Sequence, residues 1–101
     1  MECTPGTPTL PAGEIAELRA QLRDGWTVVD GTMLHRDIRL PDFMSAVQLT
    51  DRIAVIAEEQ GHHPDLHVSW GRLGIDLTTH AAHGLTRNDF ILAAKIDALT
   101  P

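Results

Sequence analysis

The sequence predicts an α+β fold: a four-stranded antiparallel sheet with three helices packed on one face. Two observations lead to it. Apolar residues recur at helical spacing in three segments, and short segments of strand-like alternation come in two consecutive pairs. The predicted element order is α-β-β-α-β-β-α. A chain of 101 residues with 43% hydrophobic residues suffices for one core, so we expect a flexible tail at 1–10 and a single domain at 11–101.

The first helix is predicted to start at Pro11, a residue suited to a first helical turn. Ile15, Leu18 and Leu22 follow at helical spacing and give it one apolar side. Gly25 is the residue expected to close it.

A hairpin is predicted next, over residues 26–40. Asp30-Gly31 lies between two strand-like segments and is a strong signal for a type I′ turn. On the second strand, alternation places three apolar residues on one side: Leu34, Ile38 and Leu40.

The long segment 41–61 is predicted to form a helix that ends at Gly61. Its apolar stripe consists of Phe43, Ala46, Val47, Thr50, Ile53, Ala54, Ile56 and Ala57. Met44 and Val55 lie on the opposite side. They are either ordinary exposed apolar residues or part of a subunit contact.

A second pair of strands is predicted at 67–70 and 73–80, with Gly71-Arg72 as the turn. Alternation again puts an apolar set on one face: Leu73, Ile75 and Leu77. Thr86 then begins the last helix, with Asp89 three residues later completing a capping pattern.

Composition restricts the classes of function. A formal net charge of -6 argues against nucleic acid as a partner, because phosphate contacts require Lys and Arg. A single cysteine, Cys3, excludes an intrachain disulfide. The sequence contains neither a membrane-spanning apolar segment nor a secretory signal, so we expect a cytoplasmic protein.

Histidine is the unusual residue. Five of the six histidines fall within the segment 62–83. His62 and His63 follow the long helix, and His80 ends the last strand, so the predicted fold allows these three to be neighbours in or near loops. Imidazole exchanges protons near neutral pH, and Glu58 or Asp89 could hold such a ring. Pro64 restricts the backbone of His63 to an extended geometry.

Simpler interpretations exist for each of these residues. Asp89 alone is more typical of a helix cap, and Glu58 alone of a solvated helix residue. The remaining histidines are expected at the surface: His35, His67 and His83. A zinc site is the competing hypothesis, from the spacings of His63 with His67 and of His80 with His83, but these pairs span loops and no cysteine accompanies them. We therefore expect no metal.

The segment 58–90 resembles the pterin-4a-carbinolamine dehydratases, also called 4a-hydroxytetrahydrobiopterin dehydratases. The resemblance rests on several spaced elements and covers roughly residues 11 to 99. The elements are Glu58, His62-His63-Pro64, Trp70, Thr79-His80, Gly84-Leu85-Thr86 and Asp89.

The resemblance implies a reaction. The 4a-hydroxytetrahydropterin released by aromatic amino acid hydroxylases loses water to give quinonoid dihydropterin. No metal or organic cofactor takes part, and members form homodimers or homotetramers. His62 and His80 would be the acid and base, in an order left open, and His63 would position the pterin. Supporting or substrate-binding roles would fall to Glu58, Pro64, Trp70, Thr79 and Asp89.

A non-catalytic role on the same scaffold is the alternative. Relatives of the family act as a transcription-factor dimerisation partner or as a Rubisco assembly factor, and fold does not dictate function. Such a role would use an outer surface or a sheet edge. The intact set of Glu58, three histidines and Asp89 favours the enzyme.

Overall fold

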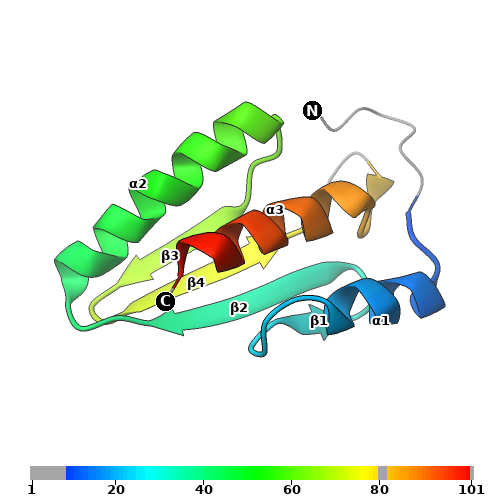
Figure 1. Cartoon of the computed structure of the whole chain (residues 1–101), viewed down its shortest axis with the longest axis horizontal. Coiled ribbons are helices and arrows are strands. Elements are labelled where there is room, and N and C mark those ends of the chain that lie inside the picture. The colour runs from blue at the N-terminus through cyan, green and yellow to red at the C-terminus, as the bar shows by residue number, and fades with distance from the viewer. Residues whose placement is uncertain (1–8, 80–81, 101) are drawn as a thin grey trace.

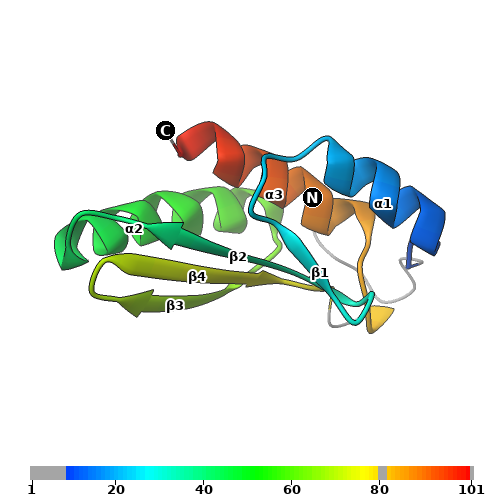
Figure 2. The same cartoon turned by 90° about the horizontal axis from the view of Figure 1, so that it is seen from below.

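The computed structural model describes residues 9–79 and 82–100. The elements are α1 (Ala12–Ala20), β1 (Thr27–Val29), β2 (Met33–Arg39), α2 (Phe43–Gln60), β3 (Asp65–Ser69), β4 (Arg72–Leu77) and α3 (Arg87–Leu99). The strands form one antiparallel sheet in the order β1-β2-β4-β3, and Figure 1 shows the helices lying across it. Figure 2 shows that all three helices cover the same face. The predicted fold class and element order are confirmed.

The two faces of the sheet differ because side chains alternate along each strand. On β4, Leu73, Ile75 and Leu77 face the helices and are fully buried, opposite Leu34 and Ile38 of β2. No helix of the described residues covers the opposite face, which holds mostly polar residues (Figure 2). No helix among the described residues is long and apolar enough to cross a membrane.

The first hairpin turns at the predicted residues. Asp30 and Gly31 both have positive φ angles, of 52° and 69°, as a type I′ turn requires. The N–H of Thr32 closes the turn by donating to the carbonyl of Val29 at 3.0 Å.

Helix α2 ends before Gly61 as predicted and has most of the predicted stripe, but it begins at Phe43 and not at Pro41. Asp42 caps its start, accepting from the backbone N–H of Ser45 at 2.8 Å, and Gly61 ends it in a left-handed conformation. Phe43 and Ala54, predicted in the stripe, are exposed. The buried line along this helix is Ala46, Leu49, Ile53 and Ala57, of which Leu49 was missed in the predicted stripe.

Several predicted boundaries were wrong. The strands predicted at 67–70 and 73–80 run over Asp65–Ser69 and Arg72–Leu77, because β4 pairs with β2 only as far as Leu77, opposite Leu34. Helix α1 ends at Ala20 and does not reach Gly25, because the N–H of Arg23 donates to Asp97 of α3 at 3.0 Å and so leaves the helical ladder. The second turn lies at residues 70–71, because Gly71 adopts the positive φ that the turn needs and Arg72 already pairs within the sheet.

The far end of α3 is fixed by a buried carboxylate. Asp97 Oδ1 accepts from the indole N–H of Trp26 at 2.9 Å and from the guanidinium of Arg36 at 2.6 Å. These bonds join α3 to the sheet and to the loop after α1, and they hold the helix whose other end carries Asp89.

The limits of the domain stay a prediction. Leu10, assigned to the tail, donates its N–H to the carbonyl of Leu85 at 2.9 Å and packs against the core. Residues 1–8 lie outside the described part of the chain.

Candidate active site

The chain leaves α2 through a turn that brings His62 back toward the helices. Gly61 is left-handed, with a φ of 62°, and the N–H of His62 donates to the carbonyl of Ala57 at 3.1 Å. A residue with a side chain is strained in this conformation, so glycine suits the position. The turn is followed by Pro64 and the start of β3.

His62 is buried, and its ring contacts a buried carboxylate. The Nε2 atom lies 2.5 Å from Oδ1 of Asp89. An ionised carboxylate only accepts hydrogen bonds, so the hydrogen-bond pattern assigns the proton to Nε2 of the ring. The orientation of His62 is thereby fixed.

Asp89 receives three donors at the beginning of α3. Its Oδ2 accepts from the backbone N–H of Thr86 at 2.9 Å and from the hydroxyl of Thr79 at 2.8 Å, while Oδ1 faces His62. Thr86 and Asp89 form the predicted capping box. A buried carboxylate is tolerated when it is hydrogen-bonded in this way.

Thr79 closes the network from the end of the sheet. It forms an isolated bridge with Gly84, and its hydroxyl lies 2.8 Å from that of Thr86. Because the single hydroxyl proton of Thr79 goes to Asp89, Thr86 is the donor between the two threonines. Within the described residues, no buried side-chain polar atom lacks a partner.

His63 lies on the other side of the same turn and faces solvent. Its Nε2 lies 3.0 Å from Oε1 of Glu58, which is also exposed. Two adjacent histidines therefore have opposite environments, each with its own carboxylate.

The structure thus brings three predicted site residues into one buried network: His62, Thr79 and Asp89. It places His63, paired with Glu58, at the turn beside this network. Trp70 is not among them: it lies at the β3–β4 turn, at the other end of that hairpin from His62. His80 follows Thr79 in the chain but lies outside the described residues.

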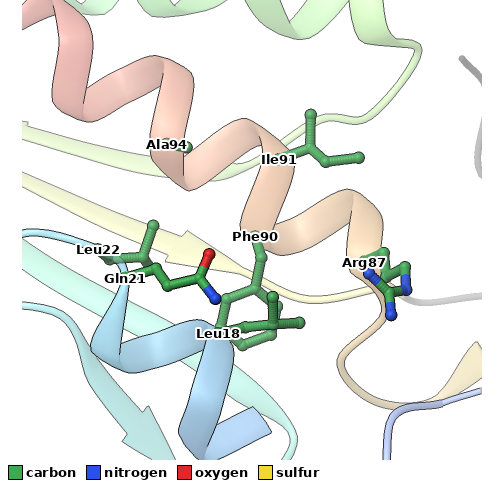
Figure 3. A pocket seen from close by; sticks show the side chains of 7 residues that line it. All are labelled: Leu18, Gln21, Leu22, Arg87, Phe90, Ile91 and Ala94. Carbon is green, nitrogen blue, oxygen red and sulfur yellow. The ribbon is translucent and has the colours of Figure 1, made fainter. Parts of the chain in front are cut away.

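A separate apolar pocket of about 270 Å³ lies between α1 and α3 (Figure 3). It is lined by Leu18, Gln21, Leu22, Arg87, Phe90, Ile91 and Ala94. None of the predicted site residues that the structure describes lines this pocket, and Arg87 at its rim is paired with Glu14.

A second histidine network on the uncovered face of the sheet was missed. His35 Nδ1 lies 2.5 Å from Asp76 Oδ1, and its Nε2 lies 3.1 Å from Asp37 Oδ2. His67 contacts the other oxygen of Asp76 at 3.2 Å. Alternation placed residues 35 and 37 on one face, but the pairing with Asp76 depends on a cross-strand register that the sequence did not supply.

This network shifts the pKa of His35 and of Asp37. The hydrogen bond to Asp76 raises the pKa of His35 above its usual value, partial burial opposes this, and the bond to Asp37 adds to it. The pKa of Asp37 is lowered, first by His35 and then by Arg72. Among the residues that can be described, no three His, Cys, Asp or Glu side chains are arranged to hold a metal ion.

Comparison with known proteins relates the whole domain to one family. The family described as Pterin 4 alpha carbinolamine dehydratase matches residues 8–99. A relative from Rickettsia bellii is 43% identical over 97 residues, covering 96% of this chain and 86% of its own length. One from Rubrobacter xylanophilus is 45% identical over 101 residues, covering 97% and 94%. The names of both assign them to the pterin-4-alpha-carbinolamine dehydratases.

Solved structures agree. The crystal structure of a transcriptional coactivator/pterin dehydratase from Brucella melitensis has a TM-score of 0.86 at 32% identity, covering 92% of this chain and 99% of its own. A pterin dehydratase-like protein identified as a RuBisCO assembly factor in the alpha-carboxysome has a TM-score of 0.61 at 23% identity, covering 77% and 87%, which is a likeness of fold alone. With the family match over residues 8–99, these findings show that the chain belongs to the pterin-4-alpha-carbinolamine dehydratases, a family of hydro-lyases.

Proposed function

We propose that this chain dehydrates 4a-hydroxytetrahydropterin to quinonoid dihydropterin and water. The observation that carries the proposal is the buried contact between His62 and Asp89, next to an exposed His63, in a chain of this family. The proposed role is to recycle the pterin cofactor of an aromatic amino acid hydroxylase.

The reaction requires one acid and one base. The bond between C4a and the hydroxyl oxygen breaks as the oxygen takes a proton and leaves as water. The proton on N5 goes to a base, and its electron pair forms the double bond between N5 and C4a. Histidine suits both steps, because imidazole gives and takes protons near neutral pH. We assign them to His62 and His80, in an order left open.

The environment of His62 supports this assignment. A ring held through Nε2 by a buried carboxylate keeps one orientation, so that a proton would be exchanged with the substrate at Nδ1. Asp89 would act as a positioning residue, since it reaches the substrate only through the ring of His62, and Thr79 would position Asp89.

His63 supports a different role. Its exposed ring, paired with Glu58 at the end of α2, is available to lie against a flat pterin. Pro64, the next residue, restricts the backbone that carries this ring.

The decay of freshly generated 4a-hydroxytetrahydropterin tests the proposal. We expect the wild-type chain to accelerate it and the His62→Ala and His80→Ala variants each to lose about a hundredfold or more of that acceleration. His83→Asn is the matched control, because His83 is an exposed loop histidine with a positive φ that asparagine tolerates. Decay at the spontaneous rate with the wild type, or full activity in both alanine variants, would overturn the assignment.

Self-association is part of the proposal, as a homodimer or homotetramer. Strand β3 is a five-residue sheet edge, and the exposed side of α2 carries Met44 and Val55. The mass in solution, measured by light scattering, should be two or four times the 11.1 kDa of one chain. A monomer at micromolar concentration would remove both surfaces from consideration.

A binding or assembly role is the second candidate, favoured by the same exposed apolar side chains on α2. Replacing Met44 and Val55 together by serine should leave dehydration unchanged per folded subunit and weaken capture of a partner. A variant that loses dehydration and partner capture in parallel would argue that the surface serves only the enzyme's own assembly.

A further inference from the structure

A hollow of about 480 Å³ lies at the end of the sheet where β2 runs out and the β3–β4 turn begins. Its lining is Asp37, Arg39, Leu40, Trp70, Gly71 and Arg72, and we call it the arginine hollow. The six residues of β4, about 20 Å of strand, separate this turn from Thr79 and the candidate active site. In Figure 1 this end of the sheet lies at the left, beside the beginning of α2.

The backbone that frames the hollow is held in place. The N–H of Leu40 donates to the carbonyl of Gly71 at 3.0 Å, which ties the end of β2 to the turn. Gly71 has a φ of 72°, and a Cβ there would lie 3.3 Å from the carbonyl oxygen of Leu40. Only glycine combines this conformation with this contact without strain.

The hollow carries an excess of positive charge. Arg39 and Arg72 stand directly opposite each other on β2 and β4, an arrangement that is unfavourable for like charges unless an anion joins them. Asp37 forms an ion pair with Arg72: its Oδ1 accepts hydrogen bonds from Nε at 2.9 Å and from Nη2 at 2.5 Å.

Asp37 contacts Arg72 and His35 and forms no ion pair with Arg39. Its Oδ2 lies 3.1 Å from His35, and Gly74 leaves the space in which Arg72 reaches across to it. The nearest further carboxylate in the sequence, Asp42, caps α2. Arg39 is exposed and has no ion-pair partner within residues 9–79 and 82–100.

An aromatic ring lines the same hollow. Trp70 is 76% exposed, more than any other large hydrophobic residue in the described chain. The hollow is thus lined by a solvent-exposed indole and by a guanidinium that has no ion-pair partner in the described chain. Indole offers a stacking surface for a flat ring, and guanidinium offers a planar fork for a carboxylate or phosphate.

We propose that the arginine hollow binds a small anion attached to a flat aromatic ring, of the size of a nucleoside monophosphate. The ring stacks on Trp70, and the anionic group receives hydrogen bonds from Arg39 and faces Arg72. A volume of about 480 Å³ is within the range of small-molecule sites. The proposal concerns a site separate from the proposed dehydration and does not depend on it.

The two tryptophans allow a direct test by NMR on the full chain labelled with ¹⁵N. Trp26 donates its indole N–H to Asp97 in the interior, so its signal is an internal reference, whereas the signal of Trp70 reports on the hollow. The probes are adenosine monophosphate, adenosine and inorganic phosphate. We expect the monophosphate to shift the Trp70 signal saturably, with a Kd about tenfold or more below that of either fragment.

Arg39→Gln removes the unpaired charge and keeps the length of the side chain. It should raise the Kd for adenosine monophosphate about tenfold, whereas Arg52→Gln, at an exposed arginine of α2, should leave it unchanged. The proposal is overturned by equal affinity for adenosine and its monophosphate, by equal affinity for phosphate alone, by equal effects of the two variants, or by no saturable shift.

Discussion

The molecule contains two histidine–aspartate pairs with the same distance and different surroundings. His62 and Asp89 are 2.5 Å apart and are 5% and 0% exposed. His35 and Asp76 are also 2.5 Å apart but are 29% and 18% exposed. Distance alone therefore does not distinguish a candidate catalytic pair from a surface ion pair, and burial does.

The difference lies in what can replace a lost partner. Water reaches the outer pair on the uncovered sheet face, so the contribution of that pair to stability is small, about 0–1 kcal/mol. The inner pair sits in a closed set of hydrogen bonds with Thr79 and Thr86, and a removed partner leaves a buried polar group unsatisfied. Substitution in the inner pair should therefore lower the free energy of unfolding strongly, and substitution in the outer pair only weakly.

The largest contrast should appear when each carboxylate is deleted. Asp89→Ala should lower the free energy of unfolding by about 3–5 kcal/mol, because three donors and the cap of α3 lose their acceptor. Asp76→Ala, the matched change in the outer pair, should lower it by about 1 kcal/mol or less. Urea denaturation of both variants measures the difference, and equal losses would refute the contrast.

The milder substitution Asp89→Asn separates the effect of Asp89 on the His62 ring from its effect on the stability of the fold. In Asp89→Asn the side-chain oxygen must stay where Thr79 and Thr86 donate, so the amide nitrogen faces His62. The ring must then accept at Nε2 and carry its proton on Nδ1 instead. Asparagine still caps the helix, so the loss of stability should be about 1–2 kcal/mol.

Dehydration by Asp89→Asn should nevertheless fall about a hundredfold. If His62 is the base, its Nδ1 is already protonated, and if it is the acid, a neutral amide no longer stabilises the protonated ring. The ¹⁵N shifts of the ring report the tautomer, and Asp76→Asn is the control that should keep activity within about twofold. Normal activity together with a reversed tautomer would remove Asp89 from the mechanism.

Two neighbouring threonines sharpen the comparison. Thr79→Val removes the hydroxyl that donates to Asp89 inside the protein and should lower the free energy of unfolding by about 1–3 kcal/mol. Thr78 donates to the carbonyl of Thr32 at 2.7 Å near the surface, so Thr78→Val should cost about 0.5 kcal/mol or less. Thermal unfolding of the two variants is the measurement, and the reverse order would contradict the role given to burial.

The sequence predicted the fold because local patterns determine it. Alternation in β2 and β4 and the helical stripe of α2 required no knowledge of tertiary contacts. The end of α1 was mispredicted for the opposite reason: the hydrogen bond from Arg23 to Asp97 joins residues 74 positions apart. No local signal in the sequence marks such a bond.

The candidate site was predicted in part for the same reason. The end of a helix, the end of a strand and a helix cap predicted His62, His63, His80 and Asp89 as neighbours, and the family resemblance added Thr79. The burial of His62 and the bond between Thr79 and Thr86 depend on how Thr79 and the start of α3 meet the turn after α2, which spacing does not encode. Likewise His35 was expected at the surface, because only the sheet register brings Asp76 beside it.

The smallest expected effect concerns the outer pair, whose contribution should depend on pH. Both ring nitrogens of His35 face carboxylates, Asp76 and Asp37, so only the protonated ring satisfies both. The folded pKa of His35 is raised, so the stabilisation is complete below the usual value of 6.5 and is lost as pH rises through the folded pKa. The other charged groups of this face do not contact His35 but contact its carboxylate partners: His67 contacts Asp76, and Arg72 contacts Asp37.

The free energy of unfolding of the wild type should therefore fall relative to His35→Gln as pH rises above 6.5, by about 1 kcal/mol or less because the ring is partly solvated. Urea denaturation of both proteins across this range is the measurement. His67→Gln is the control, because this exposed ring contacts the same Asp76 from the neighbouring strand at 3.2 Å. Parallel curves for the wild type and His35→Gln would show that water replaces Asp76 and Asp37 at no cost. The pair of His35 and Asp76 would then contribute nothing to the free energy of unfolding. Burial would account for the whole difference in stability between it and the pair of His62 and Asp89.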